Sequence, residues 1–411
     1  METSTSRIQR HLEQLAEFTA TPGQGTTRMS YSVQDKQARA YLKQEMAALG
    51  LQVREDAIGN IYGRLEGLEA DFPAVIIGSH FDSVPHGGAF DGPAGIVTGL
   101  DVIARIREQK LTPKYPIEVI ALVEEEGTSF GRGLMASSVI TGLIGTKELY
   151  QLKDRQGVSA AKRMADAGFN ADNASQAVLD PKKVKAFLEL HIEQGPVLEQ
   201  ANEDVGIVET IVGISQLEIK LMGKAGHAGT TPMDMRADAL VCASQIISQI
   251  PKLAKAVGDN TVATVGRLAV LPNGANVIPS EVIFSVDIRS KNDEALKKVI
   301  AQIITLTEQE SSDAGISCDI IQSLYVQPTE LNSEIHQLMQ QHAGAQNLRF
   351  RSMVSGAGHD TMIFAQITQT GLIFVPSRNG LSHHPDEWTD YAQIARGADV
   401  MFATVKSLTE C

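Results

Sequence analysis

The chain has 411 residues, of which 43% are hydrophobic and 21% are charged, and its net charge is −13. This length exceeds that of an ordinary single domain, so we expect two domains of a globular protein. The negative charge argues against nucleic acid or an anionic membrane as the main partner, and no apolar run is long enough to predict a membrane span. The N-terminal residues lack an apolar segment of signal-peptide length, and the three cysteines lie far apart, so we expect free thiols in the cytoplasm.

The outer parts of the chain alternate helical and strand patterns. Helices are expected at about residues 5–20, 33–48, 94–109 and 132–143. Near-continuous apolar runs, typical of strands that are buried on both faces of a parallel sheet, occur at residues 74–78, 117–123, 184–190 and 371–376. Helices between such strands predict an α/β domain with a mostly parallel sheet.

The middle of the chain follows a different order. Strands are expected at 216–223, 261–270, 281–290 and 317–325, and helices at 236–257 and 292–310. This order predicts a ferredoxin-like βαββαβ sandwich, with a helical layer on one face of the sheet. Since such a unit is complete in itself, we expect an inserted domain at 213–328 between the two parts of a catalytic domain, 1–212 and 329–411.

Three of the expected parallel strands end in residues of the types that bind metals. The strand at 74–78 is followed by His80, the next by the glutamates 124–126, and the third by HIEQ at 191–194. After the strand at 371–376, the segment GLSHHPDEW adds His383 and His384. These side chains are expected to converge, because sites of open α/β sheets form at the carboxyl ends of the strands. Histidines and carboxylates without a thiolate suit zinc, cobalt or manganese, and a shared carboxylate allows two ions ~3.5–4 Å apart.

The loop GSHFDSVPHGGAFDG at 78–92 is rich in both glycine and ligand-type residues. We expect His80 to bind a metal and Asp82 to orient its imidazole. The glycines would let the loop fold back so that Asp91 reaches the same metals, whereas His86 has no clear role. Each such motif alone is more often structural. The placement of several of them together at the ends of parallel strands is what favours a metal site. Three histidines on expected helices are interpreted as surface residues: His11, His336 and His342.

Eight segments resemble, in the right order from about residue 20 to 400, the amidase/hydantoinase/carbamoylase family of aminoacylase-like metallopeptidases. They are GSHFDSVPHGGAFDG, EEEGTSFG, HIEQGPVLE, GKAGHAGTTPM, PNGANVIP, DIRS, SGAGHD and GLSHHPDE. The family comprises N-carbamoyl-L-amino acid hydrolases, allantoate amidohydrolases and β-ureidopropionases of the fungal type. The segments together are specific for the family but not for one substrate.

The resemblance implies two divalent ions per chain, Zn, Mn or Co. It also implies two ligand sets that share Asp91. His80, Asp91 and His191 would bind one ion, and Asp91, Glu126 and His383 would bind the other. Glu125 would be the general base that activates the attacking water. The family pattern places the ligand at the first histidine of the pair, and so favours His383 over His384.

The resemblance also implies residues that contact the substrate. They are Gln194 beside the metals, His359, and from the inserted domain His227, Asn276 and Arg289, with Gln216 as a weaker candidate. His227 would also support the transition state. The inserted domain would act as a lid and form a homodimer, so that some of these residues could serve a neighbouring subunit. His86 and His384 depart from the family pattern, which affects substrate fit and not the metal set.

The implied activity is hydrolysis of the ureido group of a small ureido acid, with release of ammonia and carbon dioxide. N-carbamoyl-L-amino acids, allantoate and ureidopropionate all carry a carboxylate and a ureido nitrogen, so the sequence does not separate them. One alternative is an aminoacylase or dipeptidase of the wider clan. Another is a catalytically silent binding protein on the same fold, for which loss of Glu125 or Asp91 would be the expected mark.

Overall fold

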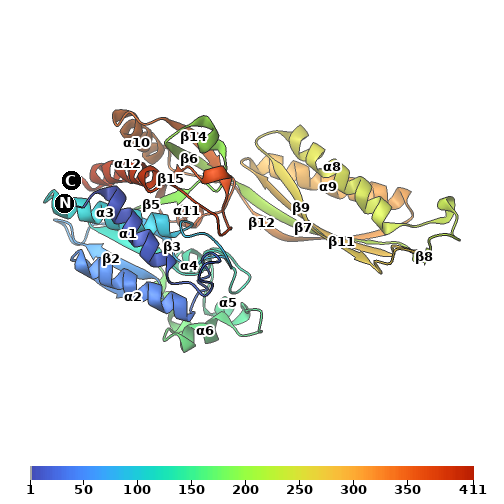
Figure 1. Cartoon of the computed structure of the whole chain (residues 1–411), viewed down its shortest axis with the longest axis horizontal. Coiled ribbons are helices and arrows are strands. Elements are labelled where there is room, and N and C mark those ends of the chain that lie inside the picture. The colour runs from blue at the N-terminus through green and yellow to red at the C-terminus, as the bar shows by residue number, and fades with distance from the viewer. Residues whose placement is uncertain (1) are drawn as a thin grey trace. The chain divides into compact units, whose positions relative to one another are not determined.

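The computed structural model describes residues 2–411 and comprises two compact units, drawn in Figure 1. The first unit spans Met1–Glu209, Leu331–Met353 and Gly358–Cys411, and the second spans Thr210–Glu330 and Val354–Ala357. The segment 213–328, where we expect an inserted domain, lies within the second unit. That unit begins slightly earlier because β6 (Val205–Ile211) pairs through its last residues with β13 (Thr329–Glu330).

The large sheet has nine strands in the order β1-β2-β4-β3-β5-β15-β6-β13, with β14 (Phe350–Ser355) beside β6. Its centre is parallel and consists of β4 (Ile117–Leu122), β3 (Ala74–His80), β5 (Val184–Ile192) and β15 (Gln369–Val375). The predicted α/β class with a mainly parallel central sheet is confirmed. The outer pairs β1–β2 and β2–β4 are antiparallel. The first of them is a hairpin of β1 (Gln52–Glu55) and β2 (Ile61–Leu65), whose short turn can join only antiparallel neighbours.

The longer helices of the first unit are α1 (Ser4–Ala16), α2 (Val33–Ala48), α3 (Pro93–Glu108), α10 (Ser333–Ala345) and α12 (Tyr391–Thr409). The shorter ones are α4 (Met135–Ile140), α5 (Thr146–Gln151), α6 (Ala160–Asp166), α7 (Val197–Ala201) and α11 (Asp360–Phe364), with 3₁₀ turns at Ala171–Ala177, Pro181–Lys183 and Arg378–Gly380. The helix expected at 132–143 is therefore shorter than predicted. Leu134 adopts a left-handed conformation (φ 58°) before it and Gly142 another (φ 76°) after it, and neither belongs in a helix.

Helix α3 packs against β3 and is buried along most of its length. It begins with Pro93, whose missing N–H is not needed in the first turn. The preceding Gly92 has φ 80°, and a Cβ there would lie 2.5 Å from Cε1 of His80. Glycine at this position therefore lets the chain turn from the 78–92 loop into α3 while it stays in contact with the His80 ring.

The second unit has a four-stranded antiparallel sheet of order β12-β7-β11-β9. The strands are β7 (Gly213–Met222), β9 (Val262–Leu271), β11 (Glu281–Ser290) and β12 (Ser317–Val326). Helices α8 (Ala239–Val257) and α9 (Asp293–Asp313) pack on the sheet, and every second residue of β11 is buried beneath them. The remaining elements are the short pair β8 (Gly226–His227) and β10 (Val277–Ile278) and a 3₁₀ turn at Met233–Met235.

One side chain that we interpreted as a surface residue is buried. His11 on α1 is 2% exposed, and its Nδ1 lies 2.7 Å from the hydroxyl of Tyr41. The interpretation of His11 as a surface residue is therefore wrong, because the buried face of α1 includes this position beside Leu12 and Leu15.

The cysteines Cys242, Cys318 and Cys411 form no disulfide. None of the helices formed by residues 2–411 has the length and hydropathy needed to cross a bilayer. The cytoplasmic location stays a prediction.

Candidate active site

The carboxyl ends of β3 and β5 and the start of α3 bring together three of the predicted ligands. His80 is the last residue of β3, His191 lies one residue before the end of β5, and Asp91 precedes α3 by two residues. The Nε2 atoms of His80 and His191 lie 3.3 and 3.2 Å from the same Oδ1 of Asp91. The donor atoms of the three side chains lie within 4.8 Å of one another, and all three residues are buried. This spacing suits a single bound cation.

A second group shares Asp91. The Nε2 of His383 lies 3.4 Å from Oδ2 of Asp91 and 3.4 Å from Oε2 of Glu126. These donor atoms also lie within 4.8 Å of one another. Asp91 thus faces the first group with Oδ1 and the second with Oδ2, which is the arrangement of a carboxylate that bridges two cations. His383 lies in the left-handed region (φ 56°), and its side chain is 49% exposed, so the second position is the more open of the two.

Asp82 connects the His80 loop with the loop after β4. Its Oδ1 and Oδ2 accept hydrogen bonds from the backbone N–H groups of Glu125 and Glu126 at 3.0 and 3.2 Å. Its Oδ1 also lies 3.6 Å from Nδ1 of His80, and its backbone carbonyl oxygen lies 3.2 Å from the same nitrogen. Asp82 therefore lies next to the His80 imidazole, and its role in orienting that ring stays a prediction. It also holds the two glutamates, which the sequence does not indicate.

Two further predicted residues lie beside members of these groups. The carboxylate oxygen Oε2 of Glu125 lies 3.8 Å from Nε2 of His80. The side-chain amide of Gln194 donates a hydrogen bond to Oδ2 of Asp91 at 2.7 Å and lies 3.2 Å from the Ser382 hydroxyl. Gln194 has a left-handed backbone (φ 57°), which turns the chain after β5. Glu125 therefore lies next to the candidate ligand His80 but belongs to neither group of candidate ligands.

The charges of these groups fit divalent cations. Burial and the neighbouring Asp91 raise the pKa of Glu126 to about 8, and burial raises the pKa of Glu125 well above its usual value. Oε1 of Glu126 is buried without a hydrogen-bond partner. Crowded carboxylates with an unpaired oxygen are unfavourable, and cations between them would act in the opposite direction. The nitrogen and oxygen donors therefore fit two divalent ions, and they do not separate zinc, manganese and cobalt.

The same carboxylates raise the pKa values of two histidines at this site. Although burial opposes it, Glu125, Asp82 and Asp91 raise the pKa of His80 well above its usual value. The hydrogen bond to Asp91 raises the pKa of His383 to about 9. Because a metal binds neutral imidazole, cations at this site would compete with protons for both rings.

The family model described as peptidase family M20/M25/M40 matches residues 76–407. The chain belongs to this family. It is 40% identical to the N-carbamoyl-L-amino-acid amidohydrolase of Paenarthrobacter aurescens over 98% of this chain and 97% of the relative. It is 36% identical to the allantoate amidohydrolase of Escherichia coli over 96% of this chain and 95% of the relative.

Among solved structures, a hydantoinase/carbamoylase family amidase from Burkholderia multivorans superposes with a TM-score of 0.93 at 32% identity, covering 98% of each chain. The resemblance to the hydantoinase/carbamoylase family that the sequence motifs predict is confirmed.

Two residues of this M20 family member that we did not predict support Asp91. Oε1 of Glu387 accepts hydrogen bonds from the backbone N–H groups of Phe90 and Asp91, both at 3.1 Å. The Ser382 hydroxyl lies 2.9 Å from Oδ2 of Asp91 and 2.9 Å from Oε2 of Glu387. A Cβ at Gly88 would lie 2.0 Å from Oε1 of Glu387, so that position requires glycine. Both residues belong to the GLSHHPDEW segment, which was the available signal.

A buried polar layer lies behind His191. The Glu189 carboxylate accepts hydrogen bonds from the Ser79 hydroxyl at 2.6 Å and from the backbone N–H and hydroxyl of Thr361 at 3.1 and 2.6 Å. Glu189, His191 and His359 form a third group with donor atoms within 4.8 Å of one another. Because Glu189 is already satisfied by these donors, we interpret this group as structural and not as a further metal site.

His359, which the resemblance implies as a substrate contact, is 2% exposed. Its ring centroid lies 4.5 Å from that of His191. Burial lowers the pKa of His359 well below its usual value, so its imidazole is neutral near pH 7. A neutral ring in this position can donate or accept one hydrogen bond without adding charge beside the candidate ligands.

The other implied substrate contacts lie in the second unit. Nε of Arg289 donates to Oδ1 of Asp287 at 2.8 Å, and Gln216 donates to Oδ2 of the same aspartate at 3.3 Å. Arg289 and Asp287 can pair because side chains two residues apart on a strand share one face. His227 on β8 is paired with Val277 on β10, and the N–H of Ala228 donates to the carbonyl of Asn276 at 3.0 Å.

The two histidines without an assigned role are exposed and lie in turns. His86 has φ 55°, and its Nδ1 lies 3.0 Å from the carbonyl oxygen of Gln24. Nδ1 of His384 accepts a hydrogen bond from the backbone N–H of Asp386 at 3.1 Å. Neither belongs to the groups of candidate ligands formed by the described residues.

Proposed function

We propose that this M20 family member is a metal-dependent amidohydrolase that removes the carbamoyl group of N-carbamoyl-L-amino acids. The observation that carries the proposal is Asp91, whose two oxygens face His80 and His191 on one side and Glu126 and His383 on the other. The substrate class is supported by the names of relatives that align over nearly the whole chain. Allantoate is the alternative ureido acid, because relatives of that name align almost as fully.

The reaction needs a stronger nucleophile than free water, because a ureido carbonyl is a poor electrophile. Two divalent ions held by His80, Asp91, Glu126, His191 and His383 would polarise that carbonyl and lower the pKa of the attacking water. Glu125 takes the proton of this water and delivers it to the leaving nitrogen. Its position next to His80, and its absence from both ligand groups, support this role.

The substrate carboxylate needs a cationic partner. Arg289 offers a planar guanidinium that is one-third exposed and is oriented by Asp287. We propose Arg289 as the carboxylate contact, with Asn276 and Gln216 as hydrogen-bonding neighbours. His227 is proposed as the donor that stabilises the oxyanion, and Gln194 and His359 as contacts on the catalytic side.

The second unit is proposed to close over the substrate and to form a homodimer. Its two edge strands, β9 and β12, expose large apolar side chains that include Val262, Leu268, Leu271 and Ile321. Apolar residues on exposed edge strands favour association with another chain. Light scattering at micromolar concentration tests the dimer. Mixing the inactive variants Glu125→Gln and Arg289→Ala tests whether Arg289 of one subunit contributes to the active site of the other. Activity would then return in mixed dimers, in which one chain supplies Glu125 and the other supplies Arg289.

A comparison of four substrates tests the activity. The metal-loaded enzyme is assayed with N-carbamoyl-L-methionine, allantoate, N-acetyl-L-methionine and L-methionylglycine, following ammonia and methionine. We expect N-carbamoyl-L-methionine to exceed the others in kcat/KM by ~10-fold or more. A higher value for the acetyl or dipeptide substrate would identify an aminoacylase or dipeptidase. No turnover of any of the four by protein with both metals bound would favour a silent binding protein.

A further inference from the structure

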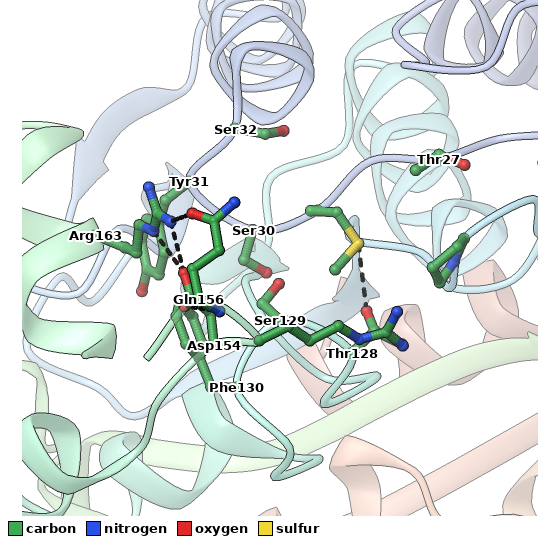
Figure 2. A pocket seen from close by; sticks show the side chains of 13 residues that line it. Thr27, Ser30, Tyr31, Ser32, Thr128, Ser129, Phe130, Asp154, Gln156 and Arg163 are labelled. Atoms are coloured by element: carbon green, nitrogen blue, oxygen red, sulfur yellow. Dashed lines mark hydrogen bonds and ion pairs between the residues drawn. The ribbon is translucent and has the colours of Figure 1, made fainter. Parts of the chain in front are cut away.

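A cavity of about 390 Å³ opens beside the loop that carries Glu125 and Glu126 (Figure 2). Three consecutive residues of that loop, Thr128, Ser129 and Phe130, line it. Other walls come from the segment 27–32 and from residues 154–156. None of the five candidate metal ligands, all within the described part of the chain, is among its lining residues. The cavity is therefore a separate site, within the size range of small-molecule pockets.

The inner end of this cavity holds two serine hydroxyls next to a buried carboxylate. Ser30 is 7% exposed, and its hydroxyl and that of Ser129 both interact with the carboxylate of Glu124. Figure 2 shows these two hydroxyls turned toward one another. Glu124 is fully buried and does not itself line the cavity. A serine hydroxyl that donates to a carboxylate can still accept a hydrogen bond, so a ligand that offers N–H donors would be held by the two hydroxyl oxygens.

Among the described residues, the outer end of the cavity has one positively charged side chain that forms no ion pair, that of Arg155. Arg163 is occupied, since its guanidinium donates to Asp154 at 2.8 Å and to Gln156 at 2.7 Å (Figure 2). Arg155 lines the cavity, is exposed, and forms no ion pair within the described residues 2–411. A carboxylate on a ligand is the group that a free guanidinium binds best.

The walls between the two ends are apolar and held in a fixed conformation. Tyr31 adopts a left-handed backbone (φ 63°), which is unusual for a bulky residue. Its hydroxyl donates to the carbonyl of Ile58 at 2.8 Å, and its ring lies 6.1 Å from that of Phe130. Met29 adds a thioether to the same lining. Strained backbone that the surroundings hold in place is characteristic of binding sites.

We propose that this cavity is a second ligand site that takes an apolar L-α-amino acid, and that its occupancy acts on the loop that carries Glu125 and Glu126. The ammonium group meets the hydroxyl oxygens of Ser30 and Ser129, which interact with the Glu124 carboxylate. The carboxylate meets Arg155. The side chain packs against the apolar wall formed by Met29, Tyr31 and Phe130.

The effect on the loop follows from its hydrogen bonds. Oε1 of Glu124 accepts the backbone N–H groups of Ser129 and Phe130 at 3.0 and 3.1 Å, which closes the loop around the glutamates. A ligand that contacts Ser129 therefore acts on a residue that Glu124 binds, and these two residues flank the segment that contains Glu125 and Glu126. This second half of the proposal rests on the proposed function, in which an amino acid is the product and Glu125 is the base.

Calorimetric titration of the metal-loaded protein with L-leucine tests the binding. Two matched probes are leucinamide, which lacks the carboxylate, and 4-methylpentanoate, which lacks the amine. We expect L-leucine to bind at this site and both probes to bind there ~10-fold or more weakly. Equal binding of 4-methylpentanoate would overturn the assignment of the ammonium to the inner end.

Variants separate this cavity from the catalytic site, where a product amino acid also has a place. Arg155→Gln and Ser30→Val should each weaken binding ~10-fold or more while thermal unfolding shows a folded protein. Arg132→Gln, which removes another exposed arginine that does not line the cavity, is the matched control. Leucine binding that survives Arg155→Gln and is lost in Glu126→Gln would place the ligand at the catalytic site and overturn the proposal.

Steady-state kinetics test the coupling. Added L-leucine should change kcat for N-carbamoyl-L-methionine ~5-fold or more, a typical coupling between sites, and Arg155→Gln should abolish this effect. Binding at the cavity with no change in kcat would overturn the coupling. If no carbamoyl substrate is turned over, the proposed function fails, whereas the titrations still decide whether the cavity binds an amino acid.

Discussion

The guanidinium of Arg289 is held by Asp287, two residues earlier on β11, with 2.8 Å between Nε and Oδ1. A second nitrogen of the same group donates to the carbonyl of Gly356 at 2.7 Å. Both partners restrict the orientation of the guanidinium, and the side chain stays 33% exposed. The aspartate therefore presents the arginine in one orientation and does not remove it from solvent.

Arg289→Lys should raise KM for carboxylate substrates by ~10–150-fold, since a charge-assisted bidentate contact contributes ~1.5–3 kcal/mol. Folding and metal content should not change. Steady-state kinetics on N-carbamoyl-L-methionine measure the effect, with Arg267→Lys on the neighbouring strand β9 as the control. Unchanged kinetics would remove Arg289 from the site and leave dimer formation as the role of the second unit.

The adjacent glutamates should respond differently to the same substitution. Glu125→Gln keeps the shape of the side chain but cannot take a proton, so kcat should fall by ~10²–10⁴ with both metals retained. Glu126→Gln replaces a candidate ligand that lies 3.4 Å from His383, so its metal content should fall first. Activity assays with elemental analysis of the same preparations measure both effects. The opposite pattern would mean that the two roles are exchanged.

Removal of metal should abolish activity reversibly. Two groups of donor atoms that share Asp91 imply two divalent ions per chain. A chelator should remove turnover, and manganese, cobalt or zinc should restore it at two ions per chain. Protein that contains no detectable metal and retains full activity would contradict the assignment.

The strands buried on both faces were the most predictable part of the fold. All seven residues of β3 are buried, and this uniform environment selects a continuous apolar run that is visible without a structure. By contrast, three of the four residues of β1 are exposed, so its sequence QVRE carries almost no strand pattern. Edge strands of this kind are specified by their neighbours, which explains why the antiparallel borders of the sheet were missed.

The candidate site was predictable where the chemistry itself demands a residue type. His80 ends a strand, and Asp91 and Glu126 lie in loops after strands, all in positions that packing alone does not explain. Glu387 was missed because its carboxylate serves backbone N–H groups 297 and 296 residues away, and any such contact depends on the folded loop. A side chain that binds backbone N–H groups leaves no pattern in the sequence of the loop that it supports, because every residue type except proline has such a group.

Glu387→Ala should weaken metal binding without removing a candidate ligand. It leaves the N–H groups of Phe90 and Asp91 unsatisfied and frees the loop that presents Asp91, and loss of such outer partners typically costs 10–100-fold in metal affinity. Glu387→Gln retains an acceptor oxygen, so its metal affinity should lie between those of Glu387→Ala and the wild type. Metal titrations measure these affinities, with Asp386→Ala, at the exposed neighbouring position, as the control. Equal affinity in Glu387→Ala and wild type would contradict the supporting role.

The buried His11 should make stability depend on pH outside the candidate site. Burial, with a smaller contribution from Arg10, lowers its pKa from 6.5 to about 4. Because the folded-state pKa is depressed, the unfolded chain binds the proton first, and stability present above pH 6.5 is lost as the pH falls toward 4. Between pH 7.5 and 5 this loss amounts to about 2 kcal/mol, at 1.36 kcal/mol for each pH unit of differential protonation.

His11→Gln removes the titrating group while keeping a polar partner for the hydroxyl of Tyr41, which lies 2.7 Å from Nδ1 in the wild type. Urea unfolding of both proteins at pH 7.5, 6.5, 5.5 and 5 should show a smaller decline in the variant, and the difference should reach about 2 kcal/mol at pH 5. His336→Gln, at a partly exposed position on α10, should decline as the wild type does. Comparison at each pH cancels the contribution of the candidate metal ligands, because they are the same in all three proteins. Parallel declines of His11→Gln and wild type would show that His11 does not titrate differently in the folded and unfolded chains.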